Sequence, residues 1–211
     1  MNVLIVAAHH DDLELGCGGT VAKLLDGGHQ VISLIMTHSG YRAPDGASVR
    51  TKDAAKKEAE SAARSLGYKL ICSDEDTFDV PVNDSNICKI LDAIHKYKID
   101  TLFTHWHGDT HPPHRRINTM ALHACRQVPR VLGFAVNWYM GEQTFSPRLF
   151  VSIDDSQWER KIGALQCYES EFRRAGPKWV EYLNHQALNY GTAIGVKRAE
   201  GFTVYKHLWE V

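Results

Sequence analysis

The feature that most constrains the fold of this sequence is the regular alternation of short apolar, β-branched runs with longer segments of helical periodicity. The apolar runs predict strands over 2–8, 31–37, 68–72, 101–105, 131–136 and 149–153, with a last edge strand over 201–207. The intervening segments predict helices over 17–26, 51–66, 85–98, 115–126, 156–172 and 179–190. Such alternation is typical of a mostly parallel β-sheet with helices on both of its faces. The sequence therefore predicts an α/β, Rossmann-like fold.

Length and composition predict that residues 1–211 form a single domain, because no Pro/Ser-rich linker, low-complexity tract or internal repeat divides the chain. Lys and Arg number 24 against 25 Asp and Glu, and a net charge of −1 lacks the basic footprint of a nucleic-acid-binding protein. The first apolar run, 3–8, is too short for a membrane span and has no basic residue before it, unlike a signal peptide. Five scattered cysteines without a C-x-x-C pair argue against a disulfide framework. We therefore expect a cytoplasmic protein, and a homo-oligomer is compatible with this sequence.

A first cluster of candidate functional residues follows the first predicted strand. His9, Asp11 and Asp12 lie where that strand ends, and ligands of such folds bind beyond the carboxyl ends of the strands. Two adjacent acids repel each other unless a cation or a shared proton offsets their charge. A turn can aim His9 and Asp12 at one metal ion and leave Asp11 beside it to accept a proton from water. The alternative is structural: either Asp caps the next helix, and His9 makes a hydrogen bond in the core.

A second cluster follows the fourth predicted strand, and its loop can face the same crevice. Pro112 and Pro113 block helix formation until about His114, so the loop can present His114 as a third ligand and His111 as a hydrogen-bond donor. We expect His105 to be a core residue and His107 to be solvated or on the pocket rim, and neither is among the predicted ligands.

Two His and one Asp with open coordination positions suit hydrolysis at Zn²⁺ or oxygen chemistry at Fe²⁺. Asp11 favours hydrolysis, because a hydrolase needs a general base beside its water and an oxygenase does not. The predicted cofactor is Zn²⁺, with Fe²⁺ or another divalent metal as alternatives.

Two motifs at these positions resemble the LmbE/PIG-L family of zinc-dependent N-deacetylases, which act on N-acetylglucosamine derivatives. Residues 8–14 read A-H-H-D-D-L-E against the family pattern A-H-P-D-D-x-E, and the glycine-rich segment 16–20 follows. Residues 109–115 read D-T-H-P-P-H-R against D-x-H-x-D-H-R. The resemblance implies an amide hydrolase whose partner is a small-molecule amino-sugar substrate, from which it releases acetate. It also implies His9, Asp12 and His114 as zinc ligands, Asp11 as general base, and His111 as the group that stabilises the oxyanion and assists the leaving amine.

Further residues are expected to support this site. We expect Glu14 and Asp109 to hold the ligands from behind, and Arg50 and Arg148 to contact the sugar. Other candidates for the sugar site, each with an equally good surface or packing explanation, are Arg42, Trp138 and Tyr139.

Three positions depart from the family pattern, and they affect substrate choice more than the reaction. His10 replaces a proline, Pro113 replaces an aspartate expected to hold His111, and Ala55 stands where the family often has an arginine. Alternative functions are an amidase that removes a larger acyl group from a glucosaminide, and a non-catalytic sugar- or metal-binding module on the same scaffold.

Overall fold

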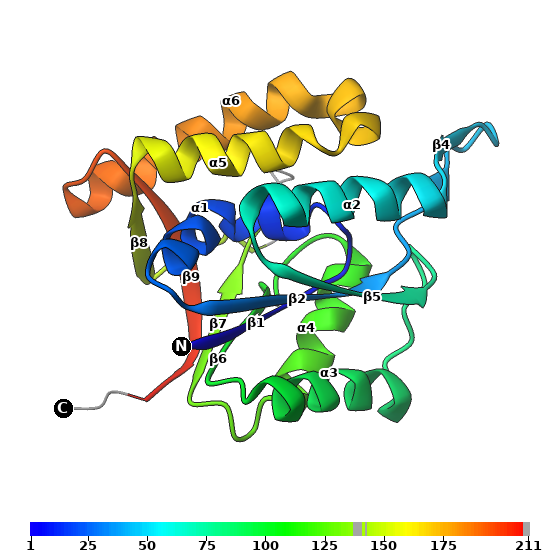
Figure 1. Cartoon of the computed structure of the whole chain (residues 1–211), viewed down its shortest axis with the longest axis horizontal. Coiled ribbons are helices and arrows are strands. Elements are labelled where there is room, and N and C mark those ends of the chain that lie inside the picture. The colour runs from blue at the N-terminus through cyan, green and yellow to red at the C-terminus, as the bar shows by residue number, and fades with distance from the viewer. Residues whose placement is uncertain (137–140, 142, 209–211) are drawn as a thin grey trace.

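The structure, a computed structural model, describes residues 1–136, 141 and 143–208, and it has the predicted α/β architecture (Figure 1). The strands are β1 (Asn2–Ala7), β2 (Gln30–Thr37), β3 (Tyr41–Arg42), β4 (Ser48–Arg50), β5 (Lys69–Glu75), β6 (Thr101–His105), β7 (Arg130–Phe134), β8 (Leu149–Ile153) and β9 (Arg198–His207). The helices are α1 (Asp12–Asp26), α2 (Lys52–Leu66), α3 (Asp84–Tyr97), α4 (Pro112–Ala124), α5 (Asp155–Gln166) and α6 (Glu169–Ile194). Of these helices, none has the length and apolar character needed to cross a membrane.

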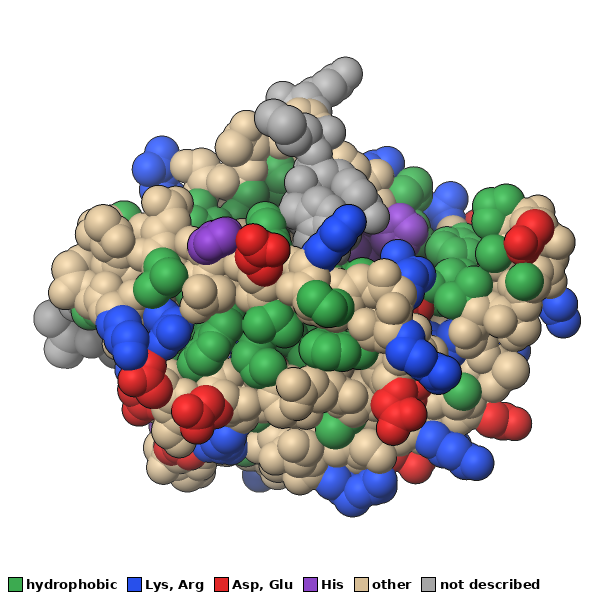
Figure 2. Space-filling model, turned by 90° about the horizontal axis from the view of Figure 1, so that it is seen from above, with side chains coloured by type: hydrophobic (Ala, Val, Ile, Leu, Met, Phe, Trp, Pro, Cys, Tyr) green, Lys and Arg blue, Asp and Glu red, His purple; other side chains and the backbone are tan. Residues whose placement is uncertain are grey.

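Seven strands form one sheet in the order β5-β2-β1-β6-β7-β9-β8, in which β9 runs antiparallel to both of its neighbours. Helices α1, α2, α5 and α6 cover one face of the sheet, and α3 and α4 cover the other (Figure 1). Each face has its own apolar core, and β1 contributes Val3 and Ile5 to one and Leu4 and Val6 to the other. The prediction of a mostly parallel sheet with helices on both faces is confirmed. The face seen in Figure 2 carries intermixed basic and acidic side chains, in keeping with the near-neutral charge.

Three helix boundaries differ from the sequence prediction. Helix α1 begins at Asp12 and contains a kink at Cys17, so the predicted start at 17 is the start of its second segment. Helix α4 begins at Pro112, because proline is well suited to a first turn, where its missing N–H is not needed. The break between the last two helices falls at Cys167 and Tyr168, and Pro177 lies inside α6. The short β3–β4 hairpin was not predicted.

The ends of the central strands β1 and β6 place both predicted clusters at one edge of the sheet. These strands are parallel neighbours, and Val3 to Val6 pair in register with Thr101 to Thr104. The turn after β1 carries His9 to Asp12, and the loop after β6 carries Asp109 and His111 into α4. The two loops therefore meet in the crevice that the sequence predicts.

A buried ion pair stabilises the kink of α1 behind this crevice. Glu200 on β9 accepts hydrogen bonds from the backbone N–H groups of Gly19 and Thr20, at 3.0 and 2.7 Å. N–H groups at the start of a helical segment have no acceptor within the helix, and Glu200 supplies one. Lys161 on α5 lies 2.6 Å from Glu200 and also donates to the carbonyl of Leu15 at 3.0 Å. Both charged side chains are almost fully buried.

We predict that Lys161→Met destabilises the protein by about 3–5 kcal/mol, because it leaves the carboxylate of Glu200 buried without its cation. For a chain of this length the melting temperature should fall by on the order of 10 °C. The double variant Lys161→Met/Glu200→Gln is the control, since it removes the uncompensated charge and should recover much of the loss. Equal melting temperatures for wild type and Lys161→Met, measured by calorimetry, would contradict this role.

Candidate metal centre and active site

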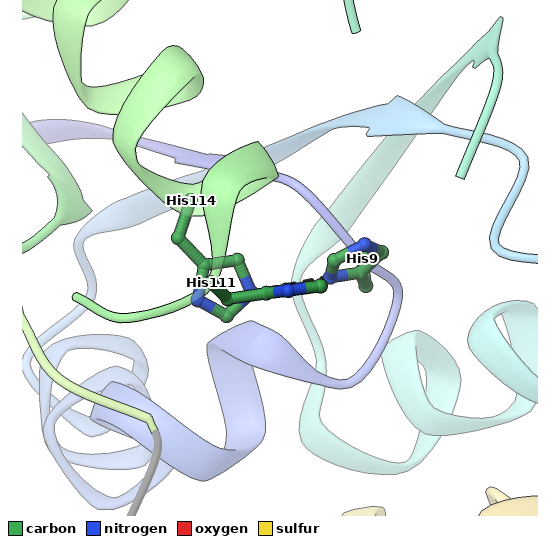
Figure 3. A group of neighbouring side chains, drawn as sticks. All are labelled: His9, His111 and His114. Carbon is green, nitrogen blue, oxygen red and sulfur yellow. Dashed lines mark hydrogen bonds between the residues drawn. The ribbon is translucent and has the colours of Figure 1, made fainter. Parts of the chain in front are cut away.

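Three side chains from the two loops converge on one point. The ring of His9 leaves the turn after β1, and the ring of His114 leaves the first turn of α4 towards it (Figure 3). Nδ1 of His9 lies 3.2 Å from Nε2 of His114. The carboxylate of Asp12 completes the group, with oxygens 3.5 Å from Nδ1 of His9 and 3.4 Å from Nε2 of His114. The structure thus brings together the three residues that were predicted as ligands.

Each of these side chains is held by a hydrogen bond, and in the two histidines this bond is made by the nitrogen that faces away from the centre. Nε2 of His9 donates to the backbone carbonyl of Thr77 at 3.0 Å, so its Nδ1 is the nitrogen that points inward. Nδ1 of His114 pairs with Asp109 at 2.9 Å. Oδ2 of Asp12 accepts from the backbone N–H of His9 at 2.6 Å. Such outer contacts are what orients the ligands of metal sites.

The residues fit a tetrahedral cation. Bonds of about 2.0–2.1 Å to a zinc ion place neighbouring ligand atoms about 3.3 Å apart. The 3.2 Å between His9 and His114 is close to this separation, and each oxygen of Asp12 lies at a similar distance from one of the two rings. The electrostatics also favour a positive charge at this point. Burial lowers the pKa of His114, but Asp12 and Asp109 outweigh burial and raise that pKa to about 9. The two carboxylates next to His114 thus favour a positive charge at this point.

Among the described residues, two overlapping groups of side chains have ligand atoms close enough for a metal ion: His9 with His111 and His114, and Asp12 with His105 and His114. Both groups contain His114. The predicted ligand set of His9, Asp12 and His114 combines members of both groups. The metal content of single-residue variants distinguishes these ligand sets.

Asp11 lies beside the ligands in the wall of the candidate pocket. The pocket has a volume of about 290 Å³ and is lined by His9, Asp11, Asp12, Leu15, Tyr41, Arg50, Thr77, Phe78, His111, His114, Val136, Glu171, Arg174 and Trp179. Burial raises the pKa of Asp11, although the nearby guanidinium of Arg50 opposes the shift. Asp11 is the residue before the first helical position of α1, but its side chain does not cap the helix. The structural alternative for Asp11, a helix cap, therefore receives no support.

His111 precedes α4 and lies next to the ligand rings. Its ring centroid is 5.1 Å from that of His9 and 4.7 Å from that of His114 (Figure 3). Burial and the neighbouring positive charge of His114 lower the pKa of His111 to about 4. Asp109 binds the backbone N–H of His111 at 2.8 Å rather than its ring. Because Pro113 carries no carboxylate, the ring of His111 forms no hydrogen bond within the part of the chain that the structure describes.

His105 is the residue of this cluster that the sequence analysis set aside as core. It is fully buried at the end of β6, its ring stacks on that of His114 at 3.9 Å, and its Nε2 lies 3.1 Å from Oδ2 of Asp12. The placement in the core is correct, yet His105 also contacts two of the predicted ligands. The sequence signal for a role of His105 near the site was its position two residues before His107, at the start of a His-rich loop.

The two residues expected behind the ligands are both buried there. Asp109 holds His114 and the backbone of His111, as described above. Glu14 accepts a hydrogen bond from the hydroxyl of Tyr68 at 2.7 Å, and its other oxygen lies 3.2 Å from the hydroxyl of Tyr168, which donates to the carbonyl of His10 at 2.5 Å. Glu14 therefore supports the turn that carries the ligands rather than a ligand itself. Burial raises the pKa of Glu14 to about 8.

Of the described residues that were expected to contact the sugar, one lines the pocket and two do not. Arg50, at the end of β4, is 5% exposed, lines the pocket and donates to the carbonyl of Ser39 at 2.8 Å. Arg148 is exposed just before β8 and Arg42 is exposed on β3, and neither is among the residues that line this pocket. Trp138 and Tyr139 lie outside the described residues.

Arg50 also lies near the position affected by the Ala55 departure. Ala55 is buried in α2, and a guanidinium nitrogen of Arg50 approaches Glu58 of the same helix at 3.8 Å. This nitrogen, Nη1 of Arg50, is buried and has no partner within hydrogen-bond distance among the described residues. An arginine from the strand before α2 thus reaches the pocket wall beside Glu58.

Several pocket residues were not predicted from the sequence. Tyr41 donates to Glu171 at 2.6 Å, and Glu171 binds Arg174 through two hydrogen bonds of 2.9 and 2.6 Å, which links the β3–β4 hairpin to α6. Neither Tyr41 nor Glu171 lies in the two motifs that the sequence analysis describes.

Comparison with proteins of known sequence and structure shows which proteins this chain is similar to. It is 30% identical to the diacetylchitobiose deacetylase of Thermococcus kodakarensis over 94% of this chain and 81% of that protein. A conserved protein of Thermus thermophilus superposes with a TM-score of 0.82 at 26% identity, over 100% of this chain and 97% of the other. The N,N'-diacetylchitobiose deacetylase of Pyrococcus horikoshii, complexed with its inhibitor MPG, superposes with a TM-score of 0.81 at 26% identity, over 96% and 83% of the two chains.

A family model gives the assignment directly. The model described as PIG-L, GlcNAc-PI de-N-acetylase, matches residues 4–125, which is more than half of the chain. The matched range contains both motif loops, from the turn after β1 to the end of α4. The chain therefore belongs to the PIG-L (LmbE/PIG-L) family.

Proposed function

We propose that this protein is a zinc-dependent N-deacetylase that removes the acetyl group from an N-acetylglucosamine-type amino sugar or its conjugate. Water is consumed, the amide C–N bond breaks, and acetate and the free amine are released. The membership of the PIG-L family and the similarity to diacetylchitobiose deacetylases support the reaction and the substrate class.

The observation that carries this proposal is the arrangement of one carboxylate and two imidazoles around a point, with a second carboxylate beside it in an open pocket. His9, Asp12 and His114 would hold the cation, and the 3.2 Å between the two ring nitrogens, with the carboxylate of Asp12 beside both rings, supports this. Asp11 faces the same pocket, and its side chain is not used to cap α1. A purely structural cluster would not need a second acid in a pocket wall.

A bound Zn²⁺ would supply Lewis acidity, which polarises a carbonyl group and makes a water molecule more acidic. The remaining chemistry falls to side chains of the protein. Asp11 accepts the proton of the attacking water as general base. His111, whose ring makes no hydrogen bond to another described residue, donates a hydrogen bond to the oxygen on which negative charge develops. A proton then passes from these groups to the leaving amine.

Arg50 is the candidate contact for the sugar, because it lines the same pocket as the ligands. Its Nε donates to the carbonyl of Ser39 at 2.8 Å and its Nη1 lies 3.8 Å from Glu58, so the guanidinium is held in the pocket wall. Arg148 stays a weaker candidate, since it lies away from the pocket lining.

We predict that removal of the metal by a chelator lowers acetate release from N-acetylglucosamine or N,N'-diacetylchitobiose at least about 100-fold, and that Zn²⁺ restores it. The measurement is an enzymatic acetate assay on the dialysed protein, with re-addition of Zn²⁺, Fe²⁺ and Mg²⁺ in parallel and Asp11→Asn protein as the background control. Acetate release that survives complete metal removal would overturn the metal-dependent mechanism. Tight sugar binding without any release of acetate would instead identify a binding module.

A further inference from the structure

The turn that carries two of the predicted ligands contains a histidine, His10, where the family pattern has a proline. A proline has no backbone N–H and fixes its own φ, so at this position it would make the turn stiff and would need no acceptor. His10 restores the N–H group and removes that stiffness. Because His10 is only 1% exposed, its N–H requires an acceptor within the protein. The turn between His9 and Asp12 must therefore be held by a contact that a proline turn does not need.

The hydroxyl of Ser39, just beyond the end of β2, supplies this contact. Strand β2 is the parallel neighbour of β1, so the segments that follow the two strands lie at the same edge of the sheet. Oγ of Ser39 accepts from the backbone N–H of His10 at 3.1 Å. It also lies 3.2 Å from Oγ1 of Thr37, which donates its one proton to the carbonyl of Ala8 at 2.8 Å. The hydroxyl of Ser39 therefore accepts from His10 and donates to Thr37, and this chain of three hydrogen bonds spans residues 8–10.

The backbone of Ser39 is strained in a way that serves these contacts. Its φ is +55°, in the left-handed region that residues with a Cβ atom rarely adopt. Such a conformation persists only where the surrounding structure holds it, and it is found mostly at functional sites. Ser39 is fully buried, and its carbonyl accepts from Nε of Arg50 at 2.8 Å. Ser39 thus bonds the ligand turn through its side chain and the pocket arginine through its backbone.

The other contacts of His10 fix different atoms. Its carbonyl accepts from the hydroxyl of Tyr168 at 2.5 Å, and its Nε2 lies 3.6 Å from Sγ of Cys72. Neither contact satisfies the N–H group of His10. Loss of the Ser39 hydroxyl would leave this N–H buried without an acceptor, so the turn would shift to find one. A shift of the turn would displace the ligands on both sides of His10.

We propose that Ser39 is a positioning residue for the metal site: its hydroxyl fixes the turn at His10, and with it His9 and Asp12, in place of a proline ring. The inference rests on the proposed metal-dependent function and adds the residue that keeps two of its ligands in register. Ser39 acts only through His10, since it is not among the residues that line the pocket.

The test is a double-mutant cycle in which the dissociation constant of Zn²⁺ is measured by competition with a chromogenic chelator. We expect Ser39→Ala to raise this constant about tenfold, since changes behind metal ligands typically cost about 10–100-fold in affinity. In His10→Pro protein the N–H is absent, so the further change Ser39→Ala should have little effect, which gives a coupling of about tenfold. His10→Ala keeps the N–H and loses the ring, and in that protein Ser39→Ala should still weaken Zn²⁺ binding about tenfold.

Two further variants separate the hydroxyl from the fold. Ser33→Ala is the matched control, because Ser33 is a fully buried residue of β2 whose hydroxyl has no hydrogen-bond partner among the described residues. It should leave the affinity for Zn²⁺ unchanged. Ser39→Gly also lacks the hydroxyl but relieves the left-handed conformation, so it should be at least as stable as Ser39→Ala and bind Zn²⁺ as weakly. Wild-type affinity in Ser39→Gly, or the same loss from Ser39→Ala with and without the His10 N–H, would overturn the role of the hydroxyl.

Failure of the proposed function gives a different result. A wild-type protein that binds Zn²⁺ without releasing acetate would refute the deacetylase and leave the cycle above as the test of Ser39. If the wild type binds no Zn²⁺, amide hydrogen exchange of His10, followed by NMR in the metal-free protein, decides instead. Exchange about tenfold faster in Ser39→Ala than in wild type and Ser33→Ala supports the hold on the turn, and equal rates overturn it.

Discussion

Replacement of Asp11 by Asn is expected to lower kcat at least about 100-fold while the content of bound metal stays at the wild-type level. A positioned general base contributes about 10²–10⁴-fold to a rate, and an amide cannot accept the proton of water. Asn has nearly the shape of Asp, and Asp11 makes no helix-capping bond that the change would break. The loss should therefore appear in kcat and not in folding.

The measurement combines steady-state kinetics on N,N'-diacetylchitobiose with metal analysis of the same protein preparation. Asp12→Asn is the informative comparison, since Asp12 is a predicted ligand next in the chain and its replacement should reduce metal affinity as well as activity. Full activity of Asp11→Asn at normal metal content would show that another group takes the proton.

His114→Ala and His9→Ala are expected to lose bound metal, whereas His111→Ala should keep it and lose kcat. His114 belongs to both groups of side chains that are close enough for a metal ion, so neither of these arrangements survives its removal. His111 belongs to one group only. A donor to the oxyanion acts mainly in the transition state, so His111→Ala should lower kcat about 100-fold with little change in KM.

Metal content by elemental analysis and kcat at saturating Zn²⁺ separate these cases. His107→Ala serves as the control, because His107 is an exposed neighbour in the same loop that contacts Tyr205 and not the ligands. Loss of metal in His111→Ala with retention in an Asp12→Ala protein would identify His9, His111 and His114 as the ligands and exchange the roles of His111 and Asp12.

The sequence alone is sufficient to predict the sheet and the place of the site. Strand β1 and strand β6 are short, continuous apolar runs, and a strand that is buried on both faces shows this pattern irrespective of its partners. The parallel arrangement then brings the residues after both strands to one edge, so that His9 and His114 meet although 105 positions separate them. The helix boundaries were less predictable. Pro112 starts α4 rather than delaying it, because a proline is excluded from the interior of a helix but not from its first turn.

Other features of the site depend on tertiary structure, and no local sequence pattern predicts them. The carbonyl that fixes the ring of His9 belongs to Thr77, and any residue type could have supplied a backbone carbonyl there. The contact of Glu171 with Tyr41 joins residues 130 positions apart, from a hairpin and a helix whose packing no periodicity predicts. The types and spacing of side chains indicate whether a segment forms a helix, a strand or a turn. Hydrogen-bond partners and exposure are set by which surfaces pack together, so the outer contacts of the ligands and the lining of the pocket were decided only by the folded chain.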